Sequence, residues 1–151
     1  MHLDELTNLG LIFADLPGTD VHTLLRAFAD RVADEGAVSD ADDLYRRLYE
    51  REELDSTGLG SGVAIPHCKM EGLDAVVLSI GLHRRGVDFA AVDKQPVHLF
   101  FLIVSPDDQP GAHLKALSAV SKWVKADDHV PRILEQSDPQ AILALLRTES
   151  S

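Results

Sequence analysis

The sequence predicts an α/β (α+β) fold: a single three-layer domain, residues 1–151, with a central mixed sheet of about five strands and helices on both faces. Length is the first observation behind this prediction, because 151 residues make one domain that buries roughly two-thirds of its unfolded surface. Composition is the second: 45% hydrophobic and 26% charged residues are typical of globular domains and exclude extensive disorder. Strand-like and helix-like apolar patterns also alternate along the chain.

The N-terminal part is predicted to form one strand and two helices. The apolar run 9–13, before the Pro17-Gly18 turn, predicts a buried strand. Apolar residues then recur at helical spacing from Val21 to Val32, with Thr19 or Asp20 as the N-cap and Gly36 as the stop. Residues 39–42 open a second helix, which we expect to end near Arg51-Glu52.

The middle of the chain is predicted to supply most of the sheet. Residues 54–62, with serine, threonine and three glycines, are expected to form a loop. Val63–Ile65 is a short strand that Pro66 ends or leaves at a sheet edge. Stretches rich in Val, Ile, Leu and Phe predict two long strands at 75–82 and 97–104, with a short extended piece at 86–89 between them.

The last third is predicted to be helical. A stripe of apolar positions (Leu114, Leu117, Val120, Ser121 and Val124) follows the Pro110-Gly111 turn. Pro131 and Pro139 each suit the first position of a further helix, and Asp138 is a suitable cap for the second of these.

Charge and cysteine content restrict the function. Fourteen Lys+Arg against 25 Asp+Glu give a net charge of −11, which excludes nucleic acid and anionic membranes as main partners. The one cysteine, Cys68, excludes an intramolecular disulfide framework. The N-terminus lacks the basic region of a signal peptide, and no apolar stretch is long enough to span a membrane. We therefore expect a cytoplasmic protein.

Histidines are the candidate chemical groups. The seven histidines lack the i, i+4 and His-x-His spacings of metal ligands, so no metal site is predicted. The sharper feature is the segment Gly58-Leu-Gly-Ser-Gly-Val-Ala-Ile-Pro-His67, which is neither a Walker A nor a dinucleotide-binding motif. Because Pro66 is rigid and biases Ile65 toward extended geometry, His67 is expected to project from a stiff strand end.

This segment resembles the signature of a known family. Arg51-Glu52, Ser56-Thr57-Gly58 and Gly62-Val-Ala-Ile-Pro-His67 are similar to the enzyme IIA domains of fructose/mannitol type in the phosphoenolpyruvate-dependent phosphotransferase system. The resemblance continues through Phe89–Val97, Leu102–Pro106 and His113–Ser118 and covers nearly the whole chain. The stretch Phe89–Val97 is most like the nitrogen-regulatory branch. Cys68 stands where the family often has glycine.

The resemblance implies roles for five residues and for the partners. His67 would be the phosphorylated nucleophile and would accept a phosphoryl group from an HPr-type phosphohistidine carrier, without a cofactor. Arg51 and His113 match the family's two side chains next to that histidine, where an arginine fork and an N–H donor can stabilise phosphoryl oxygens. Ser56 and Thr57 could complete the phosphate cradle. The group would then pass to an enzyme IIB cysteine, as in fructose/mannitol-type sugar uptake, or serve regulation.

Purely structural roles for these residues, and other functions of the protein, stay open at this point. Arg51 could simply cap its own helix, His113 could be an ordinary residue of a helix start, and Ser56-Thr57 could form a turn. A small hydrolase could use His67 and His113 as an acid/base pair, with Cys68 as an adjacent nucleophile. A third possibility is a binding module in which His67 never carries phosphate.

Overall fold

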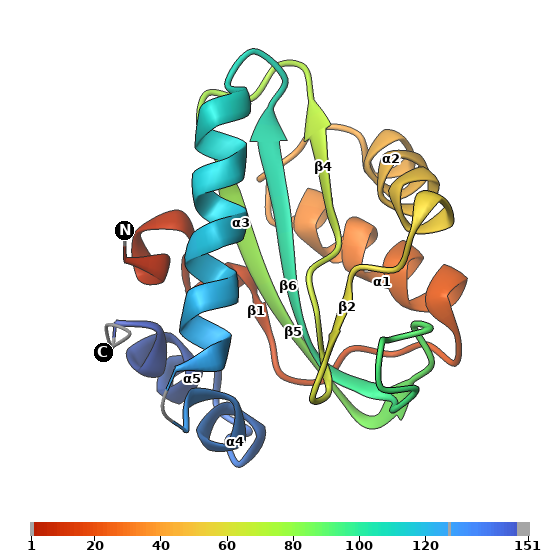
Figure 1. Ribbon diagram of the computed structural model, residues 1–151. Coiled ribbons are helices and arrows are strands. Elements are labelled where there is room, and N and C mark those ends of the chain that lie inside the picture. Colours follow the sequence, from red (N-terminus) through yellow and green to blue (C-terminus); the bar gives the residue numbers. More distant parts are fainter. Residues whose placement is uncertain (1, 127, 148–151) are drawn as a thin grey trace.

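A mixed sheet of six strands lies at the centre of the described chain, residues 2–126 and 128–147 of a computed structural model (Figure 1). The strand order is β1-β5-β6-β3-β2, with β4 also paired to β6. The strands are β1 (Ile12–Phe13), β2 (Gly58–Gly60), β3 (Val63–Ala64), β4 (His67–Met70), β5 (Val77–Val87) and β6 (Val97–Pro106). The predicted fold class is confirmed, with one strand more than expected.

Helices cover both faces of this sheet, as predicted. In Figure 1, α3 crosses the front face, whereas α1 lies behind the sheet with α2 beside it. Each side has its own apolar core: Phe28 and Leu48 belong to the core under α1 and α2, and Phe101 and Trp123 to the core under α3, α4 and α5. The helices are α1 (Val21–Asp34), α2 (Ala41–Leu54), α3 (Pro110–Lys125), α4 (His129–Leu134) and α5 (Pro139–Leu146).

The predicted ends of the first two helices are largely confirmed. Asp20 caps α1 by accepting from the Thr23 backbone N–H at 2.9 Å, and Gly36 follows the helix with a φ of +82°. The helix α2 begins after its cap Asp40 but runs to Leu54, two residues past the expected end.

The strand that carries His67 differs from the prediction. Pro66 does end β3, but the chain then continues along the same side of β6 as β4. Both pieces run parallel to β6, and the Ile103 N–H donates to the Pro66 carbonyl at 3.0 Å across the break. Pro66 lacks an N–H but its carbonyl can still accept, so the pairing is interrupted rather than ended. His67 is therefore the first residue of a strand, not a projection from a strand end.

Four further predictions need correction. Residues 9–13 form a strand only at Ile12–Phe13, after a 3-10 turn at Leu9–Leu11. The expected loop 54–62 contains β2, which makes an antiparallel hairpin with β3 around Ser61, whose φ is 56°. The strand predicted at 75–82 extends to Val87 and includes part of the piece expected at 86–89. Pro131 is the third residue of α4, not the first.

The buried face of α3 also differs from the predicted stripe. The residues that α3 buries are His113, Ala116, Val120 and Trp123, whereas Leu114 is 66% exposed. The leucines at 114 and 117 suggested an apolar stripe, but both border a surface pocket, and of the two only Leu117 also packs against the core. The side chain of α3 that meets the sheet nearest His67 is thus a histidine. At the C-terminal end, Asp138 caps α5 and Pro139 is its first residue, as predicted.

No helix in the described ranges is both long and apolar enough to cross a membrane.

Candidate functional site

A pocket of about 650 Å³ lies between the end of α2, the start of β4 and the first turns of α3. It brings together three of the predicted site residues, Arg51, His67 and His113, from three separate elements. The complete lining is Arg47, Glu50, Arg51, Leu54, His67, Cys68, Lys69, His113, Leu114 and Leu117. The pocket therefore combines histidine and cationic side chains with an apolar rim.

His67 opens β4 with its ring partly buried and fixed by the backbone. Its Nδ1 lies 2.7 Å from the Ile65 carbonyl oxygen. A carbonyl only accepts, so Nδ1 carries the proton and the lone pair of the neutral ring is on Nε2. Burial lowers the pKa of the His67 imidazole from its usual value; the Ile65 hydrogen bond opposes this, and the Arg51 charge adds to it. At neutral pH, His67 is thus a neutral ring with a free Nε2.

His113 faces His67 across the pocket. The two ring centroids are 5.5 Å apart, with the ring planes tilted by 50°. The His113 side chain is 6% exposed, and its Nδ1 lies 2.6 Å from the hydroxyl oxygen of Ser105. Burial lowers the pKa of His113 to about 4, with smaller contributions from the charges of His67 and Lys69. His113 is therefore neutral at pH 7.

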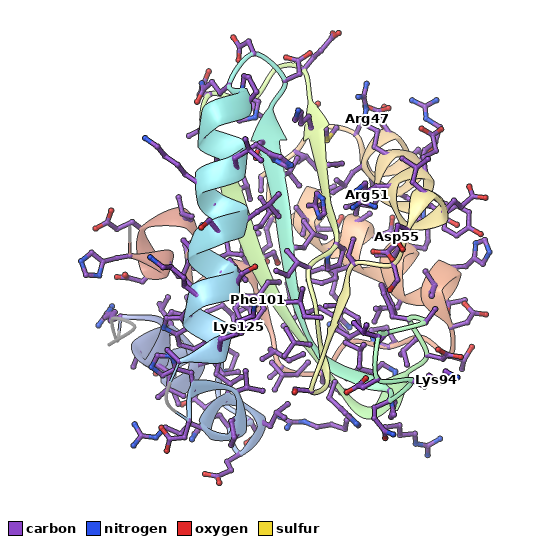
Figure 2. The ribbon with its side chains drawn as sticks, in the orientation of Figure 1. Arg47, Arg51, Asp55, Lys94, Phe101 and Lys125 are labelled. Carbon is purple, nitrogen blue, oxygen red and sulfur yellow. The ribbon has the colours of Figure 1, made fainter. Side chains whose placement is uncertain are left out.

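Arg51 has two roles in the structure. Its Nη1 donates to the Asp55 carbonyl at 2.9 Å, so Arg51 does cap the end of its own helix. The same side chain lines the pocket together with His67. Figure 2 shows Arg47 and Arg51 on the side of α2 that lies next to β4. A guanidinium has five N–H donors, so the cap leaves others available for a bound anion.

The structure does not bring Ser56 and Thr57 to this pocket. The Ser56 hydroxyl donates to the Phe89 carbonyl, and the Thr57 hydroxyl donates to the Glu52 carboxylate. The Thr57 backbone N–H also donates to Glu52, at 3.1 Å. The Thr57 hydroxyl thus joins the start of the hairpin to the end of α2, and the Ser56 hydroxyl joins the same turn to the segment after β5. The expected direct contact of Ser56 and Thr57 with phosphate does not fit this arrangement.

Cys68 is buried and poorly suited to nucleophilic chemistry. It is 8% exposed and packs in the core under α1 and α2. Because side chains alternate along a strand, it points away from the face that His67 presents. Burial raises the pKa of the Cys68 thiol to about 12, so the reactive thiolate is scarce at neutral pH. This counts against the hydrolase alternative.

Several residues that border or support the pocket were missed by the sequence analysis. Arg47 and Lys69 add positive charge, and the Arg47 guanidinium donates to the Lys69 carbonyl at 3.2 Å. The exposed leucines 54 and 114 form part of the rim. Ser105 lies beneath His113 and is fully buried. A signal existed for Arg47, which is one helical turn before Arg51, but Ser105 is linked to the pocket only through the tertiary fold.

This arrangement suits transfer of an anionic group to a ring nitrogen. Nε2 of His67 has no hydrogen-bond partner among residues 2–126 and 128–147, and neither has Nε2 of His113. Guanidinium, ammonium and imidazole donors around a nucleophile can stabilise the oxygens of a phosphoryl group. Within these same ranges, no three His, Cys, Asp or Glu side chains are placed to hold a metal ion.

Comparison with known proteins identifies the family. Residues 5–149 match the model of the family described as "Phosphoenolpyruvate-dependent sugar phosphotransferase system, EIIA 2". The chain belongs to this family. The resemblance noted from the motif around His67 is thereby confirmed, and so is the assignment as a phosphotransferase-system EIIA protein.

Relatives of this EIIA protein carry names from two branches. A "Nitrogen regulatory protein" of Pseudomonas aeruginosa is 29% identical over 97% of this chain and 95% of its own length. A "PTS system fructose-specific EIIA component" of Haloferax volcanii is 31% identical over 95% of this chain and 94% of its own. The crystal structure of nitrogen regulatory protein IIA-Ntr from Neisseria meningitidis superposes with a TM-score of 0.87 at 28% identity, covering 95% and 98% of the two chains.

Proposed function

We propose that this EIIA protein is a phosphocarrier in which Nε2 of His67 accepts a phosphoryl group from an HPr-type phosphohistidine protein. The observation that carries the proposal is the Nδ1 hydrogen bond to the Ile65 carbonyl, 2.7 Å long, which leaves Nε2 as the nucleophilic nitrogen. Neutral imidazole is a good nucleophile at pH 7, and the lowered pKa of His67 keeps it neutral.

The transfer step balances without a cofactor. The Nε2 lone pair of His67 attacks phosphorus as the N–P bond of the donor breaks, and the bonding electron pair returns to the ring nitrogen of the donor. Nδ1 of His67 keeps its proton on the Ile65 carbonyl throughout. Phosphoryl transfer needs mainly alignment and charge stabilisation. The fixed position of His67 at the start of β4 therefore supports this chemistry.

Arg51 and His113 would stabilise the transferred group. Arg51 can direct its other N–H donors at the equatorial phosphoryl oxygens, since its hydrogen bond to the Asp55 carbonyl uses only Nη1. His113, with its ring centroid 5.5 Å from that of His67, is within reach of the same oxygens once phosphorus is attached. Arg47 and Lys69 add positive charge at the pocket of a protein whose net charge is −11. The dianionic phosphoryl group is thus attracted by the positive charges at the pocket, although the protein as a whole is negative.

The rim of the pocket would be where the donor docks. Leu54 is 82% exposed and Leu114 is 66% exposed, and both border the pocket that holds His67. A phosphohistidine on a donor protein can reach Nε2 only if its surroundings cover this rim. Burial of the two leucines would then contribute apolar contact area to the complex.

The relatives support two possible roles for the phosphorylated protein. The high TM-score to IIA-Ntr and the Pseudomonas relative support a regulatory role, in which phosphorylation adds nearly two negative charges to an interface. The fructose-specific relative supports onward transfer to an enzyme IIB cysteine in sugar uptake. A solved complex of enzyme IIA mannitol with phosphorylated enzyme IIB from Escherichia coli has this fold at a TM-score of 0.75. Both roles agree with the cytoplasmic location expected from the sequence.

Incubation with phosphoenolpyruvate, enzyme I and HPr-type carrier tests the proposal. We expect one acid-labile phosphate per chain, absent from His67→Ala and retained by His98→Ala, a partly buried control histidine outside the pocket. Retention of the label by His67→Ala would contradict the proposal. Addition of an enzyme IIB then separates transport from regulation, because only the transport role predicts rapid loss of the label to IIB.

A further inference from the structure

Ser105 is a fully buried polar residue that contacts the site from below. It lies on β6, where its partner across the parallel pairing is Lys69, two residues after His67. Side chains two apart on a strand share a face, so Ser105 and His67 lie on the side of the sheet that α3 covers. From there, the Ser105 hydroxyl oxygen lies 2.6 Å from Nδ1 of His113.

This hydrogen bond has two possible directions, with different consequences for the site. If Nδ1 of His113 donates to Ser105, the neutral ring presents a lone pair on Nε2, which would repel phosphoryl oxygens. If the Ser105 hydroxyl donates to Nδ1, the ring proton is on Nε2, which becomes a donor. A neutral ring cannot donate from both nitrogens, and burial keeps His113 neutral at pH 7.

We propose that Ser105 is a positioning residue, whose hydroxyl donates to Nδ1 of His113 and thereby holds this ring in the Nε2–H tautomer needed to donate to a phosphoryl group on His67. This inference rests on the proposed function, which requires a donor at Nε2 of His113, whereas the contact between Ser105 and His113 does not depend on it. The two histidines of the pocket then have opposite tautomers. The Ile65 carbonyl selects Nδ1–H in His67, and the Ser105 hydroxyl selects Nε2–H in His113.

A serine suits this position better than a carboxylate. A carboxylate against Nδ1 would accept a hydrogen bond from the ring N–H and favour the doubly protonated, charged imidazole. A hydroxyl that donates to Nδ1 holds the Nε2–H tautomer without adding charge, so His113 stays neutral close to a second imidazole.

The tautomer can be measured directly in the unphosphorylated protein. Protonated and unprotonated ring nitrogens of histidine have well separated ¹⁵N chemical shifts. In the ¹⁵N-labelled wild type at pH 7, we expect Nε2 of His113 to be protonated and Nδ1 unprotonated. The opposite assignment, Nδ1–H, would overturn the proposal regardless of whether His67 is ever phosphorylated.

Variants then connect the tautomer to transfer. We expect Ser105→Ala to give a mixture of His113 tautomers and to slow phosphorylation of His67 roughly tenfold, as for the loss of one hydrogen bond. Ser105→Thr, which keeps the hydroxyl, should restore both properties at least in part. The matched control is Ser79→Ala: Ser79 is equally buried but donates to the Leu11 carbonyl at 2.6 Å, so its loss should leave the His113 shifts unchanged.

The outcomes separate this inference from the proposed function. An unchanged His113 tautomer in folded Ser105→Ala contradicts the positioning role even if transfer is slow, because that slowing would then have another cause. A wild type that shows the expected tautomer but never acquires phosphate contradicts the proposed function while leaving the Ser105 hydrogen bond as assigned.

Discussion

His67 and His113 face each other with ring centroids 5.5 Å apart, and the protein holds each ring by its Nδ1 atom. The two holding groups differ: a backbone carbonyl for His67 and a serine hydroxyl for His113. Both Nε2 atoms are left for chemistry, one as a nucleophile and one as a candidate donor.

Replacement of His113 should slow transfer without removing the acceptor nitrogen. His113→Ala deletes one donor to a charged group, which contributes about 1.5–3 kcal/mol, so we expect the rate of His67 phosphorylation to fall roughly tenfold to a hundredfold. The measurement is single-turnover transfer from pre-phosphorylated carrier. A variant that never acquires phosphate would instead make His113 the acceptor, and an unchanged rate would remove it from the mechanism.

Arg51 should need its guanidinium and not only its charge. Arg51→Lys keeps the positive charge but loses the fork of donors, so we expect a tenfold or larger loss in transfer rate. Arg46→Lys is the matched control, since Arg46 is on the same helix and pairs with Asp43 outside the pocket. Equal rates for the two variants would show that Arg51 acts only as the cap of α2.

The rim leucines should affect donor affinity more than stability. Leu54→Ala and Leu114→Ala remove apolar area that is exposed in the free protein, so the folded state loses little. In the complex, each truncation should raise the KM for the donor severalfold with kcat nearly unchanged. Val92→Ala is the control, because Val92 is 81% exposed but lies outside the pocket. Equal effects of all three variants would place the donor elsewhere.

Acid should destabilise the fold through His113. The pKa of this ring is lowered by burial to about 4 in the folded protein, against about 6.5 for an unperturbed histidine. Between these values the unfolded chain binds a proton that the folded protein does not, so the free energy of unfolding falls as pH drops from about 6.5 toward 4. The lowered pKa of His67 acts in the same direction.

Urea unfolding at pH 7, 6, 5 and 4.5 checks this prediction. His113→Gln removes the titrating group, so its stability should fall less steeply with acid than that of the wild type. The charged groups that line the pocket with His113 are present in both proteins: Arg47, Glu50, Arg51, His67 and Lys69. Parallel pH profiles for the two proteins would contradict the buried, neutral state of His113.

Local chemistry explains which parts of the fold could be predicted. The caps Asp20, Asp40 and Asp138 and the long apolar strand β6 depend on interactions within a few residues, so the sequence carries their signal. The strand β4 was missed because Pro66 normally ends a strand, whereas here its carbonyl keeps the register with β6. That exception depends on a distant strand and has no local signature.

The same distinction applies to the site. His67, Arg51 and His113 could be selected because they fall in a sequence motif, and the fold places all three at one pocket. Ser56 and Thr57 lie in the same motif, yet their hydroxyls bond to the Phe89 carbonyl and the Glu52 carboxylate, away from the pocket. Leu114 looked like a core residue because it has helical spacing, but only the docking of α3 on the sheet decides which face is buried. Ser105 depends on that same docking.

The attachment atom of the phosphoryl group tests the central claim most directly. We would phosphorylate the ¹⁵N-labelled protein through the carrier and detect the phosphorus–nitrogen coupling of its phosphohistidine by NMR. Our account predicts coupling to Nε2 of His67, with Nδ1 still protonated on the Ile65 carbonyl. Coupling to Nδ1 of His67, or to either nitrogen of His113, would contradict it.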